Sequence, residues 1–169
     1  YHRGRLFFGK FDKRGVAFAR ELFDRAIAID PGFARAQAGL ADCGCYLYLY
    51  AGRNQVDLDR AIEAARRALE LDPRLAEAQA SLGTALSLSG RHVEAEAAFQ
   101  SAIHLDPRLF EAHYFYARDS FAEGKLELAI QEYEEASRVR PEDYQAPLLV
   151  AQIYDDLGHA DAARASRLH

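Results

Sequence analysis

Residues 75–107 read LAEAQASLGTALSLSGRHVEAEAAFQSAIHLDP, and this stretch contains two helical patterns separated by a turn. In residues 75–90 the apolar side chains recur every three or four positions, and Gly90 is a typical helix stop. In residues 92–107 a second apolar stripe runs along one side of a helix, and Asp106-Pro107 ends it, because proline disfavours helical angles in the residue before it. The stretch therefore predicts a helix, a turn and a second helix.

The same pattern occurs four times along the 169 residues. Four prolines that follow a charged residue are spaced by 42, 34 and 34 positions, namely Pro31, Pro73, Pro107 and Pro141. Alanine stands twelve residues before each of them, at Ala19, Ala61, Ala95 and Ala129, and again five residues before each, at Ala26, Ala68, Ala102 and Ala136. Eight residues before each proline stand Phe23, Ala65, Phe99 and Tyr133. Four units in one register indicate an array of repeats.

A 34-residue helix-turn-helix unit with Leu82-Gly83, Ala95, Phe99 and Pro107 in this order resembles the tetratricopeptide repeat (TPR). The resemblance implies an all-α fold, a right-handed superhelical solenoid of antiparallel helix pairs. It covers residues 1–169 as a single array, in units of about 1–33, 34–75 with an insertion of eight residues, 76–109, 110–143, and an incomplete unit 144–169.

The opening of the chain resembles TPR arrays attached to bacterial signalling proteins, such as class III adenylate cyclases and winged-helix transcription regulators. This likeness lies in residues 4–43, GRLFFGKFDKRGVAFARELFDRAIAIDPGFARAQAGLADC. We therefore expect the chain to be a piece of a longer protein, because it begins at Tyr1. Solenoid ends expose apolar surface unless they are capped, so self-association as a homodimer is expected near the aromatic residues 6–11.

The resemblance also implies that the first helix of each unit lines an inner, concave face that binds a peptide. Helical spacing places Tyr114, Arg118 and Phe121 on one side of such a helix. With the equivalent positions of the other units, the predicted peptide-binding residues are Asp42, Cys45, Thr84, Ser87, Tyr114, Arg118, Phe121, Gln152 and Asp155.

Packing is the alternative interpretation of this face, with Tyr114 and Phe121 in the core and Arg118 as a solvated or paired charge. TPR domains that hold the C-terminal carboxylates of chaperones resemble one another in using Lys and Asn along the face. Here Arg118 is the one basic residue among the predicted positions, so we do not expect a carboxylate clamp.

Composition excludes several other function classes. A net charge of −5 without a long basic run argues against nucleic acid binding, and no apolar run approaches the 18 residues of a membrane span. The histidines, at positions 2, 92, 104, 113, 159 and 169, lack zinc-site spacing within a helix, so His92 and His113 are expected to be structural. The carboxylates, Glu132 among them, are expected on outward, solvated faces. We therefore expect no metal, no cofactor and no enzymatic activity.

Two functions of different classes remain. The first is a non-catalytic scaffold that binds a peptide segment or a neighbouring domain through the concave face. The alternative is a regulatory or oligomerisation domain of a larger signalling enzyme or transcription regulator. Two cysteines without a distant partner favour free thiols in a reducing compartment, hence a cytoplasmic location.

Residues 43–50, CGCYLYLY, lie in the unit that carries the eight extra residues. The pattern predicts that its first helix is about one turn longer and that residues 53–59 form a longer loop. Residues two apart on a helix point in different directions, so Cys43 is expected in the core and Cys45 on the groove, where it would react faster. The tip formed by residues 46–57 is a second candidate contact surface.

Overall fold

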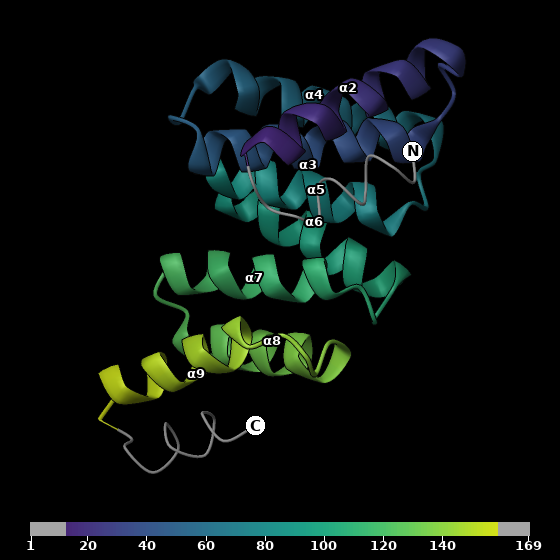
Figure 1. The fold of residues 1–169 in the computed structure, drawn as a ribbon. Helices are drawn as coiled ribbons and strands as arrows, with labels where there is room; N and C mark the ends of the chain where they lie inside the picture. The colour runs from purple at the N-terminus through teal and green to yellow at the C-terminus, as the bar shows by residue number, and fades with distance from the viewer. Residues whose placement is uncertain (1–12, 159–169) are drawn as a thin grey trace.

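The computed structural model describes residues 13–158, and within that range the regular structure is entirely helical. The helices follow one another in a stack from one end of the molecule to the other (Figure 1). They are α2 (Lys13–Ile29), α3 (Ala34–Tyr50), α4 (Gln55–Leu71), α5 (Ala76–Leu88), α6 (His92–Leu105), α7 (Phe110–Ala122), α8 (Leu126–Val139) and α9 (Gln145–Asp156). The two helices predicted from residues 75–107 are therefore confirmed as α5 and α6.

Sequential helices pack side by side in pairs, α3 on α4, α5 on α6 and α7 on α8. Helix α3 also packs on α5, and α5 on α7, so these three first helices form a continuous layer along the stack. The second helices α4, α6 and α8 cover one side of this layer. This arrangement places the predicted peptide-binding residues of several units along one layer of helices.

The repeated small and aromatic residues form the contacts between helices. Alanines at the repeated positions are fully buried, for example Ala95 and Ala102, and so is the aromatic ring of Phe99. A methyl group added at Gly83 would lie 2.7 Å from the Phe99 ring, and one added at Gly39 would lie 2.6 Å from the ring of Phe23. Glycine is therefore required at both places because a helix backbone rests directly on an aromatic ring.

The eight-residue insertion lengthens both helices of its unit. Helix α3 has 17 residues against 13 in α5 and α7, as predicted, and α4 has 17 residues against 14 in α6 and α8. The prediction of a longer loop over residues 53–59 is wrong, because only residues 51–54 separate the two helices. Helix α4 begins early since the Asn54 side chain caps it, accepting a hydrogen bond from the Val56 N–H at 3.1 Å, and Leu58 is fully buried.

Two expectations concern residues outside the described range: self-association at residues 6–11 and the incomplete end of the last unit. The division of residues 1–169 into units with the stated limits therefore stays a prediction. Within residues 13–158, each helix is too short or too polar to cross a lipid bilayer.

Candidate peptide-binding face and the polar cluster between repeats

The predicted inner-face residues of α3 and α5 are used mainly for packing. Cys45 and Thr84 are 4% and 7% exposed, and the Thr84 hydroxyl donates to the carbonyl of Ala80 at 2.9 Å. Asp42 accepts a hydrogen bond of 2.6 Å from the hydroxyl of Ser81, which joins α3 to α5. The contact of Asp42 with Ser81 therefore holds neighbouring units together, and little of the surface of Cys45 and Thr84 is available to a ligand.

Both cysteines of the CGCYLYLY stretch are buried. Cys43 lies in a core cluster with Val16 and Phe23, as predicted, but Cys45 lies in another cluster with Leu58 and does not face an open groove. Burial raises the pKa of the Cys45 thiol, and the negative charge of Asp42 adds to the effect. The expectation that Cys45 points into an open groove is therefore wrong, because α4 covers its side of the helix, whereas its faster reaction with thiol reagents than Cys43 stays a prediction.

Tyr114 on α7 is largely a packing residue, in line with the alternative interpretation. Its ring stacks on Phe110 at 5.4 Å and meets the edge of Tyr133 at 5.7 Å, and its hydroxyl donates to Gln145 on α9 at 3.1 Å. Burial raises the pKa of Tyr114, while the nearby charge of Arg118 acts in the opposite direction. Tyr114 thus connects α7 to α8 and α9.

Three of the predicted residues, Thr84, Ser87 and Arg118, meet around a small cavity between α5 and α7. Its volume is about 20 Å³, which is close to the space for a single water molecule. Leu49, which lies in the additional turn of α3, also lines it. The additional turn of α3 therefore helps to line this part of the inner face, together with α5 and α7.

The predicted residues nearer the C-terminus are open to solvent. Phe121 is 40% exposed, Gln152 and Asp155 are exposed, and Leu148, which shares their side of α9, is 51% exposed. The predicted residues on α3 and α5 are therefore mostly covered, whereas the end of α7 and one side of α9 present a mixed apolar and polar surface.

Two further surfaces differ from this face. At the predicted tip of residues 46–57, the rings of Tyr46 and Tyr50 lie 4.7 Å apart, and Tyr50 is 65% exposed. A groove of about 790 Å³ separates α2 from α4, and charged side chains of both signs line it, including Arg20 and Asp57. The repeat pattern did not indicate this groove, because it lies between second helices.

One carboxylate does not lie on an outward face as expected. Glu132 is buried, and its Oε2 lies 2.7 Å from Nδ1 of His113, while Nε2 of His113 lies 3.0 Å from the carbonyl of Pro107. Burial by itself lowers the pKa of His113, but the bonds to Glu132 and Pro107 and the negative charges nearby raise it above its usual value. The structural role predicted for His113 is thus supported, and its partner is a residue that sequence reasoning misplaced.

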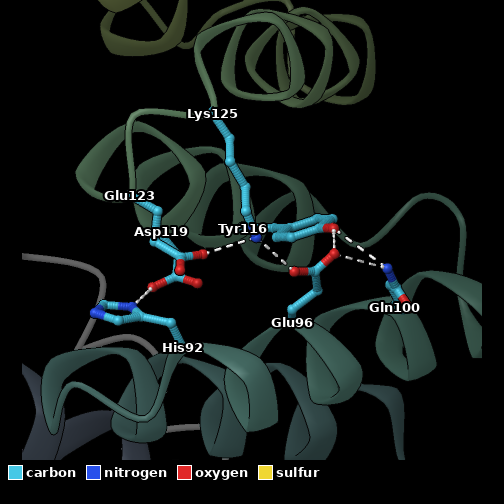
Figure 2. Close-up of polar contacts among 7 residues, drawn as sticks. All are labelled: His92, Glu96, Gln100, Tyr116, Asp119, Glu123 and Lys125. Atoms are coloured by element: carbon cyan, nitrogen blue, oxygen red, sulfur yellow. Dashed lines mark hydrogen bonds and ion pairs between the residues drawn. The ribbon is translucent and has the colours of Figure 1, made fainter.

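A second polar cluster joins α6 to α7 and to the start of α8, and Figure 2 shows its members. Nδ1 of His92 lies 2.7 Å from Oδ1 of Asp119, which is 1% exposed. The ammonium of Lys125 lies 2.8 Å from Glu96 and 2.9 Å from Glu123, so it bridges two carboxylates. The ligand atoms of His92, Asp119 and Glu123 lie within 4.8 Å of one another.

Hydrogen bonds within this cluster shift the pKa values of Glu96 and Tyr116. The hydroxyl of Tyr116 donates to Glu96 at 2.9 Å, and Gln100 donates to the same carboxylate at 3.2 Å. The bonds from Lys125 and Tyr116 hold the pKa of Glu96 below its usual range. Burial, together with the charge of Glu96, raises the pKa of Tyr116 to about 12. The cluster therefore keeps the Glu96 carboxylate ionised and the Tyr116 phenol neutral near pH 7.

Comparison with known proteins agrees with the repeat assignment. The family model described as tetratricopeptide repeat matches residues 48–109, which include α4, α5 and α6. No curated protein sequence matches the chain significantly.

Solved structures match most or nearly all of the chain. TTC0263, a thermophilic TPR protein of Thermus thermophilus, superimposes with a TM-score of 0.77 at 19% identity, covering 98% of this chain and 86% of its own. The pilF protein of Pseudomonas aeruginosa gives a TM-score of 0.74 at 22% identity over 98% of this chain and 72% of its own. The first TPR domain of Spaghetti (RPAP3), bound to the HSP90 peptide SRMEEVD, gives 0.60 at 21% identity over 72% of this chain and 93% of its own.

The matched structures have the same architecture as the helix pairs described above. This architecture is the superhelical solenoid that the sequence predicts. The chain therefore contains tetratricopeptide repeats, matched by sequence over residues 48–109, and it has the tetratricopeptide-repeat fold over the range that the structure describes.

Proposed function

We propose that the chain is a non-catalytic protein-interaction scaffold, which binds a peptide segment or a neighbouring domain along the open half of its inner face. The observation that supports this most is the exposure of Phe121 and Leu148 on α7 and α9, beside the polar residues Gln152 and Asp155. Large apolar side chains among amide and charged groups suit an extended or helical peptide, since the apolar contacts give affinity and the polar groups give direction.

The HSP90 peptide bound to the RPAP3 domain is acidic and ends in Glu-Glu-Val-Asp. We infer a different ligand for this chain, because Asp42 and Asp155 are acidic and Arg118 is the one basic residue among the nine predicted positions. An apolar segment without a terminal acidic cluster fits these charges better. Such a segment could equally belong to a neighbouring domain of a longer, cytoplasmic signalling protein.

The test is selection from a random peptide display library, followed by titration of the selected peptides. We expect the double variant Arg118→Ala, Phe121→Ala to bind them about tenfold more weakly, which corresponds to about 1.4 kcal/mol. The matched control is Val93→Ala on α6, which removes a side chain that is 83% exposed on another helix. Tyr114→Ala is less suitable, because its packing against Phe110 and Tyr133 makes loss of folding a competing explanation.

If the selected peptides bound the double variant as tightly as the wild type, the binding surface would not include the end of α7. A variant at the tip, Tyr50→Ala, then tests residues 46–57 by the same titration. Tight binding of the peptide SRMEEVD that is lost in Arg118→Ala would contradict the inferred preference against acidic ends.

A further inference from the structure

Three side chains that are common metal ligands converge where α6 meets the end of α7. His92 is the first residue of α6, Asp119 lies in the last turn of α7, and Glu123 follows that helix directly. Figure 2 shows the two carboxylates close to each other beside the imidazole. We propose that His92, Asp119 and Glu123 form a binding site for a divalent transition-metal ion such as Zn²⁺.

The carboxylate of Asp119 is the strongest indication of a ligand. The residue is 1% exposed, and Oδ1 is occupied by the 2.7 Å contact to His92. Its second oxygen, Oδ2, is buried, and among the described residues it has no hydrogen-bond partner. A buried carboxylate oxygen without a donor or a cation is costly, and native structures contain few of them. A metal ion bound between Asp119 and Glu123 would satisfy it.

The charge of the cluster also matches a divalent cation. Among the described residues the cluster has three carboxylates, those of Glu96, Asp119 and Glu123, and one ammonium, that of Lys125, which pairs with Glu96 and Glu123. Two negative charges are therefore left when His92 is neutral. The nearby Arg91 is engaged by Glu94 at 2.6 Å on the outside of α6 and does not change this count. One divalent ion would neutralise the cluster.

Metal binding requires the 2.7 Å contact between His92 Nδ1 and Asp119 Oδ1 to lengthen, and the proton of this hydrogen bond to leave to solvent as the ion binds. Zinc with N and O ligands at about 2.0–2.2 Å places neighbouring ligand atoms about 3.3 Å apart in a tetrahedron. The three ligand atoms already lie within 4.8 Å of one another, and Glu123 lies just beyond the helix end, with its side chain 24% exposed. The His92 side chain is 34% exposed, so water can supply the fourth ligand. Such a site would clamp one repeat to the next.

Lys125 competes with the ion for Glu123, because its Nζ lies 2.9 Å from Oε2 of that residue. The ion would use the other oxygen of Glu123 or displace the ammonium. Removal of Lys125 should therefore strengthen metal binding, whereas a purely structural ion-pair cluster predicts no metal binding at all.

The test is titration of the full chain, without an affinity tag, with ZnCl₂ in a calorimeter near pH 7.5, alongside the visible absorption of the Co²⁺ form. We expect one Zn²⁺ per chain and a rise in Tm on binding. His92→Ala should weaken binding by about tenfold or more, as loss of a ligand does. The matched control is His104→Ala, an exposed histidine further along α6, which should bind as the wild type.

Two further variants make the result specific. Asp119→Asn, checked for folding by circular dichroism, should also weaken binding, and Lys125→Met should tighten it. The proposal is overturned if wild-type protein shows no saturable binding at about 100-fold molar excess of Zn²⁺. It is equally overturned if His92→Ala binds as tightly as His104→Ala, since the ion would then be held by other histidines.

Discussion

At the scale of single residues, the fold depends on where side chains are absent as much as on where they are large. Gly83 and Gly39 let a helix backbone rest on the rings of Phe99 and Phe23. Both glycines stand inside helices, where they are otherwise unfavourable, so close packing must compensate for the lost helix propensity. The Leu-Gly pair of the repeat is thus a packing requirement.

Gly83→Ala should destabilise the protein, although alanine is the better helix former by about 1 kcal/mol. The new methyl group would lie 2.7 Å from a fully buried ring, and overpacking of this kind costs about 1–3 kcal/mol. Urea unfolding measures the loss. In the Phe99→Leu background the same change should cost less, because the ring is gone; equal costs in both backgrounds would show that the Phe99 ring is not the obstacle.

His113 should make stability depend on pH. Both ring nitrogens face acceptors, Glu132 Oε2 and the Pro107 carbonyl, so the protonated imidazolium fits the site best. Its pKa is raised in the folded state above about 6.5. The stabilisation is therefore complete below the unfolded pKa and is lost as pH rises through the folded pKa.

The measurement is urea unfolding of the wild type and of His113→Gln between about pH 6 and pH 9, a range that brackets the histidine pKa. The difference in unfolding free energy between them should shrink as pH rises. Glu132→Gln, which removes the charged acceptor, should weaken this pH dependence. A difference that stays constant or grows with pH would contradict the assignment.

At the scale of helices, the eight extra residues of the second unit lengthen the two helices of that unit, where their side chains can be buried. The extra residues of the second unit extend α3 by one turn and α4 by nearly one, because Leu58 and Cys45 bury against each other and Asn54 supplies a cap. A longer loop would have left the backbone groups of residues 55–59 unpaired within the helix pair. The insertion therefore produces a longer helix pair and not the predicted longer loop.

Asn54→Ala should lower the free energy of unfolding by about 1 kcal/mol, within the range of about 0.5–2 kcal/mol found for lost N-caps. The Asn54 side chain accepts from the Val56 N–H, and alanine has no acceptor to replace it. Chemical unfolding provides the measurement. Asn54→Ser keeps an acceptor and should be close to the wild type; a loss as large as that of alanine would show that the cap is not the cause.

At the scale of the whole molecule, each helix contacts only its near neighbours in the stack. Helix α5 packs against α3, α4, α6 and α7, whereas α2 packs chiefly against α3 and α9 chiefly against α8. In such one-dimensional arrays stability is a sum of local terms, so the ends open more easily than the middle.

Amide hydrogen exchange should therefore show the greatest protection in α4, α5 and α6 and progressively less toward α2 and α9. Peptide-resolved mass spectrometry provides the measurement, with exchange under conditions where opening is at equilibrium. Uniform protection from α2 to α9 would contradict local opening and indicate that the described array unfolds as one cooperative unit.

The sequence by itself determined the class of fold, since the alanine and proline register repeats at spacings of 42, 34 and 34 residues and predicts the helix pairs directly. It also predicted that Cys43 lies in the core and that α3 is one turn longer, because both follow from helical periodicity. Periodicity within one helix cannot show what a neighbouring helix covers. Helix α4 buries Cys45, and α8 and α9 partly bury Tyr114, and the spacing of residues within α3 or α7 does not indicate either contact.

Only the tertiary structure decided which polar groups meet. His92 and Asp119 are 27 residues apart and His113 and Glu132 are 19 apart, so no spacing rule within a helix brings either pair together. The stacking of one repeat on the next does, and it also divides the inner face into a covered half and an open half. Repetition in sequence specifies the local unit, whereas burial and charge partners depend on contacts between units, which are long-range and specific to this chain.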